Sequence, residues 1–103
     1  MFGAITGCVT SMFAVMDQLI GWAQSEGLSA EQATGYVTNF FAAVCQEAIR
    51  QDRTGVRTMA TVSTPGGINL QNLELIDAAG GIKAWADAIR PVFARTVGDI
   101  PKN

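Results

Sequence analysis

A serine, a threonine and two glycines lie together in the run Ser63-Thr64-Pro65-Gly66-Gly67, directly ahead of a predicted helix. The first turn of a helix offers unpaired N–H groups and about half a positive charge, which together favour a bound anion. Glycine lets the backbone approach a ligand closely, because it carries no Cβ. The spacing is compatible with a carboxylate-binding site, although a plain turn between two helices would use the same residues. The predicted site residues are Ser63, Thr64, Gly66, Gly67, Ile68 and Asn69.

Groups that catalyse reactions are sparse in this chain, which contains no histidine. A serine nucleophile would therefore depend on Lys83 or Lys102 as its base, and nothing in the sequence supports that arrangement. The carboxylates are dispersed; Glu74 and Asp77 could flank a ligand, but two carboxylates on a solvated helix face are the simpler interpretation. Two cysteines without histidine do not make a zinc site. We expect no catalytic residue and no metal ion in this chain.

The composition indicates a surface that needs a partner. Hydrophobic residues make up 49% of the chain and charged residues 16%, against a usual charged share of about 25%. The net charge is −2, and the seven basic residues are scattered from Arg50 to Lys102. Without a basic stripe the chain is not expected to bind nucleic acid.

The N-terminal segment and the cysteines indicate in which cellular compartment the chain is expected. The opening stretch has no basic residue, and Asp17 and Gln18 interrupt its apolar run, so we expect neither a signal peptide nor a membrane span. Cys8 and Cys45 fall in apolar stretches, which predicts buried, reduced thiols. The expected location is the cytoplasm.

Apolar residues recur at intervals of three and four along most of the chain, which predicts amphipathic helices. The predicted helices cover about 4–25, 29–51, 55–61, 70–79 and 82–97. No stretch alternates as a strand does, and 103 residues make one domain. The predicted fold is all-α over residues 1–103.

Several helix ends carry recognisable signals. Ser29 and Gln32 have the spacing of a capping box, and Thr54 is predicted to cap the short helix that follows it. Gly27 and Gly80-Gly81 are predicted to end the helices before them.

The apolar stripes are too broad to be hidden within about 100 residues, so we expect them to meet in a homodimer. Gly21 and Gly35 lie inside helices at a cost of about 1 kcal/mol each relative to alanine, which indicates close approach by another helix. Pro91 removes a backbone donor and predicts a bend near residue 88. The predicted dimer interface contains Val37, Phe40, Phe41, Val44, Trp85, Ile89 and Phe93.

The run from Ser63 to Gly67, the helix after it and the closing Gly80-Gly81 resemble the signature of pyrroline-5-carboxylate reductase, over about residues 5–97. The resemblance implies an interlocked helical homodimer that also supplies the site for the carboxylate of a cyclic imino acid in proline biosynthesis. It further implies that a separate N-terminal Rossmann domain, absent from this chain, holds the NADH or NADPH that reduces the imine. The sequence departs from the family pattern between Cys8 and Met12 and at Asn69.

Two functions follow as alternatives. The first is the dimerisation and substrate-contact domain of an NAD(P)-dependent oxidoreductase, which would not turn over substrate alone. The second is a stand-alone dimeric scaffold or interaction protein without catalysis. A coding region upstream of Met1 with a strand followed by GxGxxG would favour the first, and a genuine start at Met1 the second.

Overall fold

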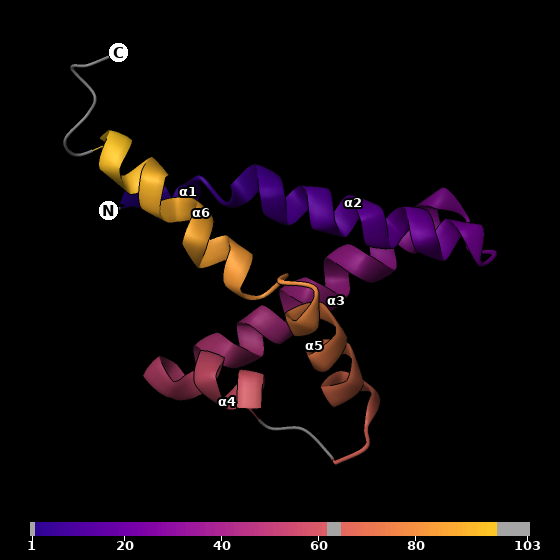
Figure 1. Ribbon diagram of the computed structural model, residues 1–103. Coiled ribbons are helices and arrows are strands. Elements are labelled where there is room, and N and C mark those ends of the chain that lie inside the picture. Colours follow the sequence, from indigo (N-terminus) through magenta and orange to yellow (C-terminus); the bar gives the residue numbers. More distant parts are fainter. Residues whose placement is uncertain (1, 62–64, 97–103) are drawn as a thin grey trace. The chain divides into compact units, whose positions relative to one another are not determined.

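Helices are the regular elements of this chain in the computed structural model (Figure 1), which describes residues 2–61 and 65–96. No strand occurs within those two ranges, which confirms the all-α prediction. The elements are α1 (Phe2–Thr6), α2 (Val9–Ser25), α3 (Ala30–Arg50), the 3₁₀ turn η1 (Asp52–Thr54), α4 (Gly55–Thr61), α5 (Ile68–Ala78) and α6 (Lys83–Ala94). The chain divides into two compact units, residues 13–63 and residues 1–12 with 64–103.

In the unit of residues 13–63, local hydrogen bonds set the turn between α2 and α3. Gly27 has a φ of 116°, and its N–H donates to the Gln24 carbonyl at 3.0 Å. A residue with a side chain rarely adopts such a positive φ, so glycine ends α2 here. The Ser29 hydroxyl accepts from the Gln32 N–H at 3.0 Å, and the Gln32 side chain accepts from the Ser29 N–H at 3.0 Å. The predicted capping box and helix end are confirmed.

The connection from α3 to α4 is tighter than a simple loop. Gly55 is buried, and a Cβ placed on it would overlap the carbonyl group of Ala48 in α3. The prediction that Thr54 caps α4 is wrong: η1 runs directly into α4, and the Thr54 hydroxyl donates to the Gln51 carbonyl at 3.3 Å. The predicted short helix at 55–61 is confirmed.

In the other unit, α1 packs against α6 (Figure 1). Ala4 is buried, and a side chain on Gly7 would approach the Val92 methyl group at 3.9 Å. The single predicted helix over about 4–25 is wrong, because the chain breaks at Gly7 and Cys8 into α1 and α2. At this break the Cys8 N–H bonds three residues back, to the Ile5 carbonyl at 3.0 Å, in place of the usual four.

The observed ends of α5 and α6 agree in part with the ends predicted from the sequence. Gly80 has a φ of 84°, and the Gly81 N–H donates to the Ile76 carbonyl at 2.8 Å, so the predicted glycine end of α5 is confirmed. The last helix continues through Pro91 to Ala94. The bend near residue 88 stays a prediction, and Val97 of the predicted last helix lies outside the described residues.

Little apolar surface is buried within the chain itself. Among the described residues, Ala4, Met16, Ala33 and Val37 form the buried apolar set, whereas 21 large apolar side chains are exposed. A domain that folds alone needs a contiguous core of such side chains. Neither unit therefore covers its own apolar helix faces within the described residues.

The close approach predicted at Gly21 and Gly35 is not made by the described residues of this chain, and an approach by a partner's helix stays a prediction. Gly21 has no neighbour among the described residues within 4 Å of where a Cβ would stand, and Gly35 meets the Asn39 amide at 4.0 Å. Cys45 is exposed on α3, and Cys8 is half-buried. The predicted burial of the two thiols is therefore wrong for Cys45 and only partly met for Cys8 among the described residues.

Candidate functional site

The predicted anion site lies at the start of α5. Gly66 adopts a φ of 78°, and Gly67 is the N-cap residue, with φ −81° and ψ 166°. The Gly67 carbonyl accepts the N–H of Gln71 at 3.1 Å, and among the described residues no side chain caps the first turn. Within the described residues, the N–H groups of that turn are therefore not taken by a side chain, which suits an anionic ligand.

A hollow of about 430 Å³ opens beside this turn; we call it the α5 hollow. Gly66 and Gly67 line it, as predicted, whereas Ile68 and Asn69 are exposed in the first turn outside the lining. The predicted Ser63 and Thr64 lie outside the described residues. The sequence analysis missed the remaining lining residues, which are Leu70, Gln71 and Glu74. Their positions three, four and seven residues after Gly67 place them on one helix face, a signal that the sequence did contain.

The electrostatics of the α5 hollow are mixed. The start of α5 contributes a partial positive charge from the helix dipole, which favours a carboxylate. Glu74 places a full negative charge on the same lining, and this charge opposes a carboxylate. A carboxylate at this place would be held by the amide groups alone and opposed by the charge of Glu74.

Removing that charge gives a direct test. We expect Glu74→Gln to strengthen carboxylate binding about twofold, since one unit charge seven residues along the helix, about 10.5 Å away in water, contributes about 0.4 kcal/mol. Calorimetric titration with proline measures the change. Glu31→Gln, on the exposed first turn of α3, is the control and should leave the affinity as it is. Equal affinity in the Glu74→Gln variant and the parent would argue against binding in this hollow.

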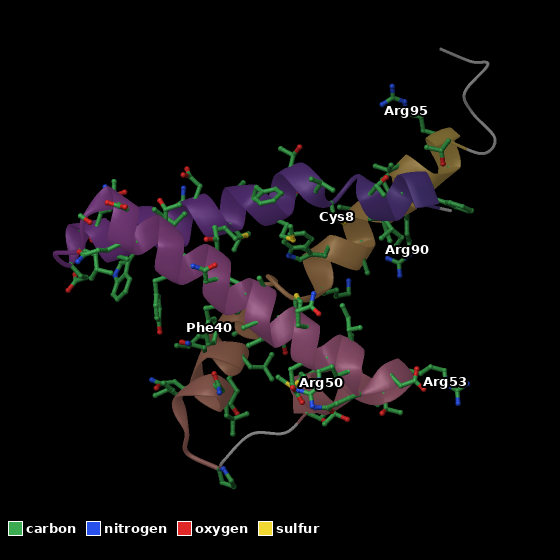
Figure 2. The ribbon with its side chains drawn as sticks, turned by 180° about the vertical axis from the view of Figure 1, so that it is seen from behind. Cys8, Phe40, Arg50, Arg53, Arg90 and Arg95 are labelled. Atoms are coloured by element: carbon green, nitrogen blue, oxygen red, sulfur yellow. The ribbon has the colours of Figure 1, made fainter. Side chains whose placement is uncertain are left out.

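A second, almost wholly apolar hollow of about 200 Å³ lies between α2 and α3; we call it the aromatic hollow. Its lining is Leu19, Trp22, Ala23, Tyr36, Val37, Phe40 and Phe41. The Phe40 ring stacks on Tyr36 with ring centroids 6.2 Å apart and meets Phe41 edge-on at 5.8 Å. Figure 2 places Phe40 on α3, where 51% of its surface is exposed.

A third hollow, of about 220 Å³, lies between α1 and α6; we call it the small-residue hollow. Its lining is Ala4, Gly7, Cys8, Ser11, Ala84, Trp85, Ala88, Ile89 and Val92. Figure 2 shows Cys8 at the junction of α1 and α2, beside α6. Most of these side chains are small, so the two helices leave a space that the chain itself does not fill.

The predicted interface residues divide between these two hollows. Val37, Phe40 and Phe41 line the aromatic hollow, and Trp85 and Ile89 line the small-residue hollow. Val37 is already buried within its own unit. The half-buried Val44 and the exposed Phe93 line neither. Tyr36 and Trp22 also line the aromatic hollow and were not among the predicted interface residues.

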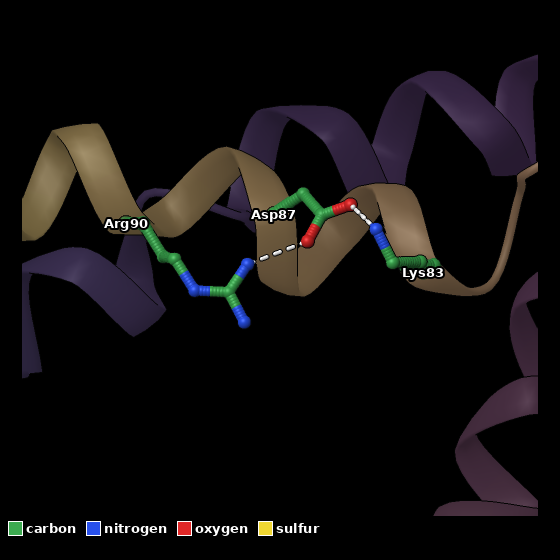
Figure 3. A network of polar contacts seen from close by, with 3 residues as sticks. All are labelled: Lys83, Asp87 and Arg90. Carbon is green, nitrogen blue, oxygen red and sulfur yellow. Dashed lines mark hydrogen bonds and ion pairs between the residues drawn. The ribbon is translucent and has the colours of Figure 1, made fainter.

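Charges also segregate along the chain. No basic residue precedes Arg50, whereas α6 carries Lys83 and Arg90 around Asp87. Figure 3 shows this network: the Asp87 carboxylate accepts from Lys83 at 2.7 Å and from Arg90 at 2.5 Å. Those two hydrogen bonds, the Lys83 bond first, lower the pKa of Asp87 below its usual value. These exposed pairs contribute little to stability, but they hold cationic groups along α6.

Helices that leave broad apolar faces uncovered, with hollows on those faces, are typical of an all-α association domain. The chain belongs to the pyrroline-5-carboxylate reductase dimerisation family, whose model matches residues 1–98. This confirms the resemblance drawn from the loop and the helix order. Comparison with curated proteins and with solved structures finds no match.

The N-terminal segment is also apolar enough to be compared with a membrane span. Gly3–Ser25 is long and apolar enough to cross a membrane, with a mean hydropathy of 1.3. By length and composition the segment passes this test despite Asp17 and Gln18, and the expectation that it is not a membrane span stays a prediction. The segment lies inside the matched residues 1–98, and helices covered by a partner chain have the same composition.

Proposed function

We propose that the chain forms a homodimer and serves as the substrate-contact domain of a pyrroline-5-carboxylate reductase-like oxidoreductase that reduces a cyclic imino acid. The family match over residues 1–98 carries this proposal. The uncovered faces of α2, α3 and α6 support the dimer, because such faces are stable in water only when another surface covers them.

The substrate carboxylate is proposed to bind at the start of α5, on the N–H groups that follow Gly67. The turn offers a partial positive charge and amide donors at one place, which suits the small planar anion of an imino acid. The part of this chain in the reaction is to orient the substrate and match its charge. The proposal gives it no catalytic acid or base.

The nicotinamide cofactor is assigned to a different domain. A dinucleotide needs a strand followed by a glycine-rich turn and a helix, and residues 2–61 and 65–96 contain no strand. The described residues therefore do not fit NADH or NADPH, and no step of the reaction is derived through the cofactor here. The expected compartment is the cytoplasm, and neither nucleic acid nor a membrane is a proposed partner.

The mass of the chain in solution tests the proposed dimer. At micromolar concentration, light scattering should give about twice the mass of the 10.9 kDa chain. The paired species should persist upon tenfold dilution, as expected for subunits with little core of their own. A mass of one chain throughout the series would contradict the proposal.

A further inference from the structure

The small-residue hollow has room for a ring that its own unit does not provide. Its volume is about 220 Å³, and an apolar cavity of about 150 Å³ already accommodates benzene. Ala84 and Ala88 form part of the α6 wall, and Trp85 offers an aromatic surface there. Aromatic side chains meet favourably edge-to-face or offset. The chemistry of the hollow thus suits one phenyl ring.

Rings of this kind are exposed on α3. Phe40 lies between Tyr36 and Phe41, in contact with both, and about half of its surface is uncovered. Because its neighbours hold the ring, burying it against another surface costs little further side-chain entropy. Phe40 is therefore well prepared to insert into a hollow.

The charges favour the same pairing. The chain before Arg50 contains four acidic residues and no basic one, and α3 lies in that acidic part except for Arg50 itself. The α6 wall of the small-residue hollow belongs to a helix with Lys83 and Arg90. Glu47 pairs with Arg50 at 2.8 Å, which leaves α3 a net charge of −1 from Glu31, and α6 keeps a net charge of +1 after Asp87 is counted. An approach of α3 to α6 therefore brings opposite net charges together, whereas α3 against α3 brings like ones together.

We propose that the small-residue hollow receives the Phe40 ring of a second copy of the chain, and that the first copy's Phe40 enters the second copy's hollow in return. The pairing rests on the proposed homodimer and specifies which surfaces meet in it. A two-fold dimer requires each copy to carry both halves of the contact, and this chain does carry both. Contact between Phe40 and α6 then explains why the small residues of α1 and α6 leave a space unfilled.

Site-directed cross-linking of the full chain tests the pairing. Cys8 lines the hollow and supplies one thiol, while Cys45→Ser removes the other. Ala43→Cys adds a thiol three residues after Phe40, on nearly the same face of α3, and leaves the aromatic rings intact. Ala42→Cys, an exposed neighbour on the opposite face, is the matched control. With a short bis-maleimide, we expect the Ala43→Cys variant to give at least about tenfold more cross-linked dimer than the control.

Filling the hollow gives a second measurement. Ala88→Trp should abolish the cross-link from Ala43→Cys, whereas Ala86→Trp, on α6 outside the lining, should preserve it. Equal cross-linking from positions 42 and 43, a link confined to one chain, or a link that survives Ala88→Trp would overturn the pairing. If the unmodified chain is dimeric but the expected cross-links do not form, only the pairing of Phe40 with the small-residue hollow is contradicted. If the unmodified chain is monomeric, the proposed dimer is contradicted as well.

Discussion

An Ile89→Asp variant is expected to be monomeric at micromolar concentration, where the parent is dimeric. Ile89 is half-buried and lines the small-residue hollow. A carboxylate there would lose its water when a second copy docks, without gaining a partner, and an unpaired buried charge costs about 3–5 kcal/mol. The dimer dissociation constant should therefore rise at least a hundredfold, a change that sedimentation or light scattering over a dilution series measures directly.

A substitution on another helix separates this effect from charge as such. Arg57→Gln also changes the net charge by one unit, but at an exposed side chain on α4, and it should leave the dimer intact. Ile89→Ala keeps the helix and removes apolar contact alone, so a smaller rise in the dissociation constant is expected. Circular dichroism reports whether each variant remains helical. An Ile89→Asp variant that pairs as tightly as the parent would place Ile89 outside the interface.

A Gly67→Val variant should lose measurable binding of proline, which carries the carboxylate of the proposed substrate. At φ −81° and ψ 166°, Gly67 has a backbone conformation that valine adopts without strain. The substitution therefore adds a branched side chain beside the first N–H groups of α5 and leaves the turn in place. The added methyl groups occupy the space through which a carboxylate approaches those amides.

Two controls make the result specific. Ile68→Val changes a side chain that is 77% exposed in the same turn but keeps every N–H group, so it should retain the parent affinity. Proline amide, which lacks the negative charge, should bind neither the parent nor the variants. Replacing the N-cap glycine by valine also costs some helix stability, because valine is a poorer N-cap residue than glycine, and circular dichroism accounts for that part. Unchanged binding of proline to the Gly67→Val variant would remove the start of α5 from the site.

The helices follow from short-range information in the sequence. The capping box at Ser29 and Gln32, the glycine end at Gly27 and the glycine end at Gly80 each involve groups within a few residues of one another. Both partners of each such hydrogen bond lie close together in the sequence. The sequence alone was therefore enough to place α3, α4 and α5 to within a few residues. The all-α class followed from the same periodicity. The family was suggested by the resemblance of the loop ahead of α5 and of the helices around it.

The tertiary structure decided which faces were covered and which residues met. Cys8 and Trp85 line one hollow although 77 positions separate them in the chain, and no local pattern specifies such a contact. The break at Gly7 and Cys8 and the exposure of Cys45 likewise depend on packing between elements. Sequence periodicity identifies an apolar face, but only the arrangement of helices in space shows whether the same chain covers it.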